Sequence, residues 1–174
     1  MGGNAARSKV GDVLGVEELG RTEGCVNFAW GNITITVYKD QATLDTVRML
    51  MHVGRVMRER HAARSAVSFV LDGVPPPSED AREPFSQLVH AAPSAISAMS
   101  TILEGEGFWA STLRSVIIGM KIEAGGQAAV EVHHGIEETV AWLPGVHHAK
   151  TGVEVNPSRL TAVLRRARAL ALDT

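Results

Sequence analysis

The strongest constraint on the fold is a β-hairpin pattern near the start of this 174-residue chain. Apolar and polar residues alternate on both sides of Gly31-Asn32, a dipeptide that favours the tight turn between antiparallel strands. The apolar set is Val26, Phe28, Trp30, Ile33, Ile35 and Val37, and the residues between them are Asn27, Ala29, Thr34, Thr36 and Tyr38. Because successive strand side chains point to opposite sides, one face of the hairpin is expected to be buried.

After the hairpin, segments with helical periodicity alternate with short apolar segments typical of strands. Helices are predicted over 42–63, from Ser78 to just before Pro93, from Trp109 to Gly125, over 136–143 and over 156–172; strands are predicted over 67–71, 95–103 and 128–132. Pro144-Gly145 is expected to end the fourth helix, with a loop over 146–155 after it. Gly54 is expected where the first helix lies close to the sheet. The order predicts an α/β fold with a mixed, mostly parallel sheet, an N-terminal β-hairpin and four to five helices.

The chain divides into three expected segments. Residues 1–23 are expected to form a flexible N-terminal arm, 24–145 a single α/β domain, and 146–174 a C-terminal helical extension. The last helix has an apolar stripe that must be buried, because an isolated helix of this length is marginal in water. That stripe consists of Leu160, Val163, Leu164, Ala167 and Ala171. Packing on the same chain is favoured, and a homodimer is the alternative.

Charge, hydropathy and cysteine content argue against several functions. The formal net charge of −2 provides no global basic field for nucleic acid or an anionic membrane. No apolar run approaches the ~20 residues of a membrane span. The one cysteine, Cys25, fits a reducing compartment and, on its predicted edge strand, acts as a small hydrophobe. The chain is expected to be cytoplasmic, with no nucleic-acid partner and no membrane span.

Three landmarks in order make residues 24–143 resemble the STAS fold of anti-sigma-factor antagonists, in particular a divergent group of small bacterial STAS-like proteins. The first is the strand and turn from Val67 to Gly73, which enters a proline-rich loop and a helix that begins at Ser78. The second is a fourth strand followed by an apolar helix. The third is the ending His133-His134-Gly135-Ile136-Glu137-Glu138-Thr139-Val140-Ala141-Trp142-Leu143. The resemblance implies a regulatory or scaffold protein that is not an enzyme and needs no cofactor.

The resemblance also implies a protein partner and a place for it. STAS antagonists switch partners when a serine at the start of the helix after the third strand is phosphorylated, and Ser78 occupies that place. The flanking Glu79 and Asp80 oppose a phosphate, so a plain helix cap is the simpler interpretation of Ser78. The candidate partner-binding residues are Pro76, Pro77, Ser78, Phe108 and Trp109, with Ser78 also the candidate phosphorylation site.

Two other functions remain open from the sequence. The protein could carry a small apolar ligand or lipid between helix and sheet, in a cavity lined by Met49, Met51, Met57, Met99 and Met120. It could also be a metal-dependent hydrolase that uses His133-His134 and His147-His148. Adjacent strand side chains point to opposite faces, so the first histidine pair is a poor metal site. Asp72 at a strand's carboxyl end is more simply a turn residue before Gly73.

Overall fold

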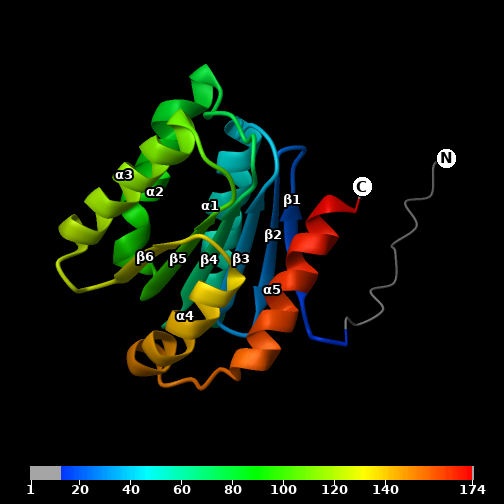
Figure 1. Ribbon diagram of the computed structural model, residues 1–174, viewed down its shortest axis with the longest axis vertical. Coiled ribbons are helices and arrows are strands. Elements are labelled where there is room, and N and C mark those ends of the chain that lie inside the picture. Colours follow the sequence, from blue (N-terminus) through cyan, green and yellow to red (C-terminus); the bar gives the residue numbers. More distant parts are fainter. Residues whose placement is uncertain (1–12, 174) are drawn as a thin grey trace.

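The computed structural model describes residues 13–173 and contains one six-stranded sheet in the order β1-β2-β3-β4-β5-β6 (Figure 1). The first three strands pair antiparallel, and β3 to β6 pair parallel. The strands are β1 (Glu17–Arg21), β2 (Cys25–Trp30), β3 (Ile33–Tyr38), β4 (Ser65–Val70), β5 (Ala98–Leu103) and β6 (Ala129–His133). The expected fold class is confirmed.

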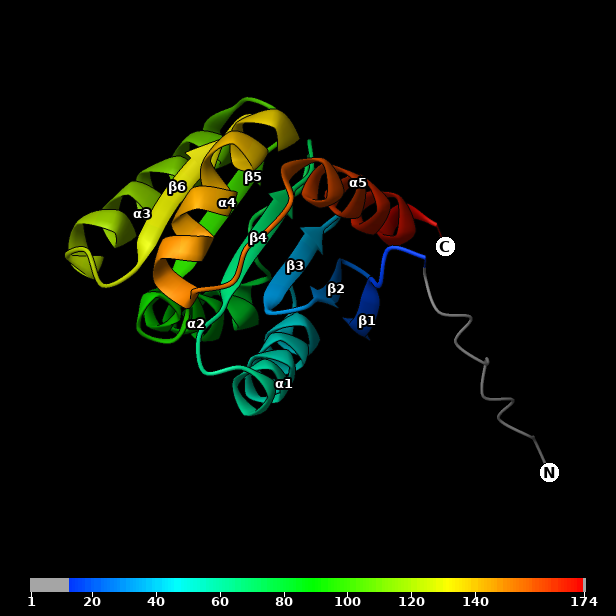
Figure 2. The same ribbon diagram turned by 90° about the horizontal axis from the view of Figure 1, so that it is seen from below.

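Five helices cover the two faces of this sheet (Figure 2). They are α1 (Leu44–Arg60), α2 (Arg82–Ala95), α3 (Phe108–Ala124), α4 (Ile136–Thr151) and α5 (Pro157–Leu172), and a short 3₁₀ turn, Glu79–Ala81, precedes α2. Each parallel crossover steps to the next strand in the same direction, so right-handed connections place α1, α2 and α3 on one face. The chain then crosses over, and α4 and α5 cover the other face. None of the helices in residues 13–173 combines the length and apolar character needed to cross a membrane.

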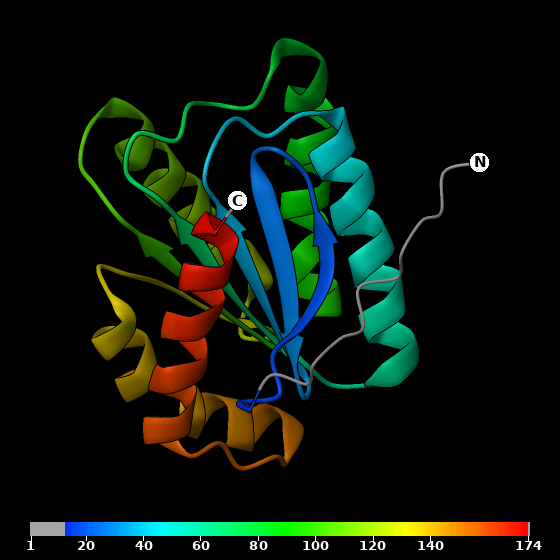
Figure 3. The same ribbon diagram turned by 90° about the vertical axis from the view of Figure 1, so that its right-hand side faces the viewer.

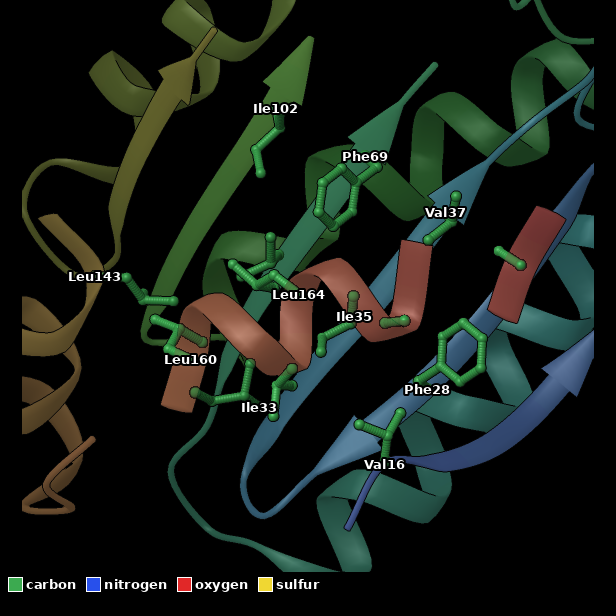
Figure 4. Packing of buried hydrophobic residues seen from close by; sticks show 14 of the residues in the cluster. Val16, Phe28, Ile33, Ile35, Val37, Phe69, Ile102, Leu143, Leu160 and Leu164 are labelled. Atoms are coloured by element: carbon green, nitrogen blue, oxygen red, sulfur yellow. The ribbon is translucent and has the colours of Figure 1, made fainter. Parts of the chain in front are cut away.

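The face under α4 and α5 holds the main hydrophobic core. The apolar stripe of α5 lies on β2 and β3, as Figures 3 and 4 show. All five residues of that stripe are fully buried, so the expectation that it packs on the same chain is confirmed. They meet large strand residues, including Phe28, Ile33, Ile35 and Phe69. Asn156 caps α5 as predicted, with its Oδ1 accepting a hydrogen bond from the Arg159 N–H at 3.0 Å.

The opposite face is built from smaller and more polar side chains. Thr34, Thr36, Ser68 and Thr101 project toward α1–α3 from the same strands whose other side carries the core. Helix α2 covers this face without a single fully buried residue among its described positions. Gly54 of α1 also lies here, and an added Cβ would meet nothing within 4 Å. The expected close approach of α1 to the sheet at Gly54 is therefore wrong.

Part of the segment expected to be a flexible N-terminal arm forms a strand. Residues 17–21 form the edge strand β1, which pairs antiparallel with β2 and shifts register between Glu18 and Gly20. Glu17 forms an ion pair with Arg60 at 2.8 Å, and Arg21 donates a hydrogen bond to the Leu170 carbonyl at 3.1 Å. The flexible-arm interpretation is thus wrong for β1, and residues 1–12 lie outside the described residues.

Two helices run through prolines that were expected to end them. Helix α2 includes Pro93, and α4 includes Pro144 and continues to Thr151. The expected loop over 146–155 is consequently helical for its first half, and the expected domain boundary at 145/146 falls inside α4. The second half of α4 is anchored by His147, which is fully buried and hydrogen-bonded to Ser65 and Asn32, and these contacts work against the about 3 kcal/mol that an internal proline costs.

Candidate functional site

A cavity of about 460 Å³ lies between the sheet and helices α1, α2 and α3. Its volume falls within the roughly 300–1,000 Å³ of sites that hold small organic ligands. Many of the strand side chains that line it are small or polar, including Thr34, Thr36, Ser68 and Thr101. It is the feature of the described chain that is best suited to binding a molecule.

The floor of the cavity is a row of polar side chains that runs across four strands. Asn27, Thr36, Ser68 and Thr101 are successive register partners on β2, β3, β4 and β5, and all four line the cavity. Asn27 is only 1% exposed, and its Nδ2 donates a hydrogen bond to Thr36 Oγ1 at 2.6 Å. Within the described residues no donor reaches the other amide atom, Oδ1. The floor thus presents a buried acceptor that lacks a partner.

The roof of the cavity is apolar. It is formed by Leu50, Met51 and Val53 of α1, by Phe85, Leu88, Val89 and Ala92 of α2, and by Leu113, Val116, Ile117 and Met120 of α3. Phe85 meets Tyr38 edge-on, with ring centroids 5.9 Å apart. Burial raises the pKa of the Tyr38 phenol well above its usual value, so this ring stays neutral. A ligand held here would contact mainly hydrocarbon above and hydroxyl groups below.

The two ends of the cavity differ in chemistry. At the carboxyl ends of the parallel strands lie Pro75, Pro77 and Trp109. The indole Nε1 of Trp109 is buried, and no acceptor in the described part of the chain meets it. A second cavity of about 270 Å³ adjoins this end and shares Trp109. At the opposite end, where the parallel strands begin, the lining includes Arg58 and Arg64.

The residues predicted to bind a partner are only partly brought together. Pro77 is buried and Trp109 half-buried, and both line the cavity. Pro76 is exposed, and its carbonyl accepts a hydrogen bond from Gln41 Nε2 at 2.9 Å. Helix α3 begins at Phe108, whose side chain lies outside what the structure describes. The predicted surface therefore corresponds in part to the wall of an internal site.

Ser78 does not cap a helix with its side chain, so that interpretation is wrong. It precedes the 3₁₀ turn, but its hydroxyl donates to Asp80 Oδ1 at 2.6 Å and makes no capping hydrogen bond. Phosphorylation of Ser78 stays a prediction, and the neighbouring Asp80 carboxylate opposes it.

Each histidine pair places one ring in the interior and one in solvent. His147 forms hydrogen bonds to Ser65 Oγ at 2.6 Å and to Asn32 Oδ1 at 3.0 Å. His133 lies 2.7 Å from Ser100 Oγ and 3.1 Å from Thr139 Oγ1. Burial lowers the pKa of both rings.

Neither buried histidine is among the residues that line the two cavities described above. His147 and its partner Ser65 are both fully buried, and Ser65 does not line either cavity. In residues 13–173 no group of three or more His, Cys, Asp or Glu side chains is placed to hold a metal ion. The two networks tie α4 to β4, β5 and the β2–β3 turn. The partners of each ring, Ser65 and Ser100, could not be found from local sequence because they come from distant strands.

The expected methionine lining is correct in part. Met51, Met99 and Met120 line the cavity, whereas Met57 is fully buried in a separate cluster and Met49 packs against that cluster.

Burial raises the pKa of Cys25 to about 12, which keeps it a thiol and makes it a poor nucleophile. The places of Asn27, Arg58 and Arg64 in the cavity were not predicted from the sequence. The alternation of threonine with isoleucine along β3 was the available signal for a polar sheet face.

Comparison with protein-family models, with curated proteins and with solved structures found no match to this chain.

Proposed function

We propose that this protein binds a small, largely apolar organic molecule in the cavity between the sheet and α1–α3, and that it acts as a binding protein rather than an enzyme. The observation that carries this proposal is the unpartnered Oδ1 of Asn27, which is 1% exposed and lines the floor. A buried polar atom left without a partner costs about 1–3 kcal/mol. A ligand that donates a hydrogen bond to Asn27 would remove that cost.

The contrast between the two sheet faces supports the same proposal. The α4–α5 face is filled by large side chains and holds the main core, whereas α2 has no fully buried residue among its described positions. A protein interior normally packs without voids, because empty space forfeits dispersion contacts. A cavity that combines an apolar roof with a few convergent polar groups is the usual form of a ligand site.

Filling the cavity tests the proposal. Ser68 lies in the middle of the floor, and Ser68→Leu places a larger apolar side chain there. The neutral polarity-sensitive dye Nile red is the probe, and its fluorescence is followed by titration. We expect dye binding by the wild type and at least about tenfold weaker binding by Ser68→Leu. The variant should keep or raise its melting temperature, since it fills empty space.

The matched control is Ser158→Leu, an exposed position on α5 over the other face of the sheet. It makes the same chemical change away from the cavity and should bind the dye as the wild type does. No dye binding by the wild type, or equal binding by Ser68→Leu and the control, would refute the proposed function.

The regulatory or scaffold role that the STAS resemblance implies remains a prediction. The surface expected to carry it includes Pro77 and Trp109, which line the cavity. A ligand that contacts these two residues would alter the same wall that a partner was expected to recognise. The double variant Phe108→Ala/Trp109→Ala tests that role by loss of partner capture with an unchanged melting temperature.

A further inference from the structure

Arg64 places a positive charge inside the molecule at one end of the cavity. It comes just before β4, is only 4% exposed, and lines the cavity. Its backbone is fixed by a hydrogen bond from the Ser97 N–H to its carbonyl at 2.9 Å. Among residues 13–173 its guanidinium forms neither an ion pair nor a hydrogen bond, and its nitrogens are not among the side-chain atoms that are both fully buried and without a partner, so they retain some contact with the space of the cavity. Buried charges in folded proteins are normally paired, because removing a charge from water without a partner is costly.

A second arginine adds to this charge instead of balancing it. Arg58, an exposed residue in the last turn of α1, also lines the cavity, and within the described chain it has no acidic partner either. Burial and the nearby charge of Arg58 both lower the pKa of Arg64. An arginine remains protonated in proteins, so both groups keep their charge. The end of the cavity therefore carries one buried and one solvent-exposed positive charge, and neither has an acidic partner in the described protein.

Negative groups elsewhere along the cavity do not reach this pair. Asp40 also lines the cavity, but it follows β3 and so lies at the opposite end of the parallel strands. Its Oδ1 accepts a hydrogen bond from the Gln41 N–H at 2.7 Å. The C-terminal end of α2 lies near the arginines and carries partial negative charge on its carbonyls, yet none of these carbonyls accepts a hydrogen bond from Arg64 in the described structure. The cavity thus carries positive charge at one end, and its roof, formed by α1, α2 and α3, is apolar.

We infer that the ligand is an amphipathic organic anion, with an apolar body under α2 and a terminal carboxylate or phosphate held by Arg58 and Arg64. This inference rests on the proposed ligand-binding function and names the class of molecule that the site takes. The guanidinium groups supply the donors that carboxylate and phosphate oxygens accept. The charge difference between the ends fixes the direction of the ligand, with its anionic group toward the start of β4 and its apolar end toward Trp109.

The test compares ligands that share a chain and differ in their terminal group. Decanoic acid, decyl phosphate and 1-decanol each displace Nile red in a competition titration. We expect at least one of the two anions to bind at least about tenfold more tightly than decanol. The stronger anion identifies whether the natural head group is a carboxylate or a phosphate.

Variants then assign the preference to the two arginines. Arg64→Met keeps an unbranched side chain and removes the charge, and Arg58→Gln replaces the charged group with a neutral amide. Both should bind decanol as the wild type does and lose most of the preference for the anion. The control Arg55→Gln changes an exposed arginine of α1 that does not line the cavity, and it should keep the preference.

A second measurement separates binding from structure. Without ligand, Arg64→Met should melt at the same temperature as the wild type or higher, because it removes an uncompensated charge. A clear drop in melting temperature would mark Arg64 as a structural residue and overturn the inference.

The outcomes also distinguish this inference from the proposed function. Equal affinity of the wild type for decanol and both anions, or an unchanged preference in Arg64→Met, would overturn the anionic head group while leaving the apolar site intact. Failure of Nile red to bind at all would overturn both.

Discussion

At the scale of single residues, the two buried imidazoles make the folded chain sensitive to acid. Burial lowers the pKa of His133 and His147 below the usual 6.5. The unfolded chain therefore binds protons in a pH range where the folded chain does not, and stability falls as the pH falls below about 6.5. We predict a smaller free energy of unfolding at about pH 5 than at about pH 7.5, measured by urea titration.

The variant His147→Gln should flatten this pH dependence in part, because one of the two shifted groups is gone. It should also be less stable at every pH, since Ser65 and Asn32 lose their partner. His90→Gln is the matched control: His90 is an exposed residue of α2 and is not among the groups that shift the pKa of His133 or His147, so its replacement should leave the slope unchanged. An identical slope in His147→Gln and the wild type would contradict this account.

Gly105 is a position where only glycine fits the backbone. Its φ of +107° lies in a region that side chains rarely adopt, and an added Cβ would collide with the Asp72 side chain. We predict that Gly105→Ala lowers the free energy of unfolding by about 1–3 kcal/mol, measured by thermal or urea unfolding. Gly119→Ala, in the middle of α3 with nothing within 4 Å, should instead raise it by about 0.5–1 kcal/mol. An unchanged free energy of unfolding in Gly105→Ala would show that the loop adapts to the added side chain.

Residue patterns predicted the core more completely than the site. The stripe of α5 was predicted in full because helical spacing directly determines which side chains share a face. Arg64 could not be predicted, since its burial depends on where α2 and β5 come to lie and not on its neighbours in sequence. Asn27 was placed correctly on the polar side of its strand, but its missing partner is a property of the assembled sheet.

At the scale of elements, α5 and α3 should contribute unequally to stability. Leu164 of α5 is fully buried in the core, whereas Leu113 of α3 is half-buried and lines the cavity. We predict that Leu164→Ala costs about 2–5 kcal/mol and Leu113→Ala roughly 1 kcal/mol. The pair is matched in chemistry and in helical context, and urea unfolding measures both. Similar losses would mean that the α1–α3 face supports the fold as strongly as the core does.

Element boundaries were the weakest part of the sequence prediction, and proline is the reason. A proline removes one helical hydrogen bond, which local reasoning treats as an end to the helix. In α4 the residues after Pro144 are held by the buried His147, a contact formed with strands far away in sequence. The edge strand β1, which pairs with β2, was missed for a different reason. Its sequence, Glu-Glu-Leu-Gly-Arg, shows no alternation of apolar and polar residues.

At the scale of the whole molecule, the two helical layers should open independently. Helix α2 has no fully buried residue in the described structure, while α5 has five. We predict that amides of α2 exchange with deuterium through local opening, and that those of α5 exchange only when the whole chain unfolds. Hydrogen-exchange mass spectrometry measures this difference, and ligand binding should slow exchange in α2. Equal protection of both helices would argue against a separately opening α2.

The division between a large-residue face and a small-residue face also has an evolutionary consequence. Substitutions among the hydroxyl groups of the floor, such as Ser68 or Thr101, change little of the packing on which folding depends. Descendants of this chain can therefore accumulate changes in the floor and roof without crossing the stability threshold that removes most core mutations. The same scaffold can diverge toward new ligands while residues such as Phe69 and Leu164 stay fixed.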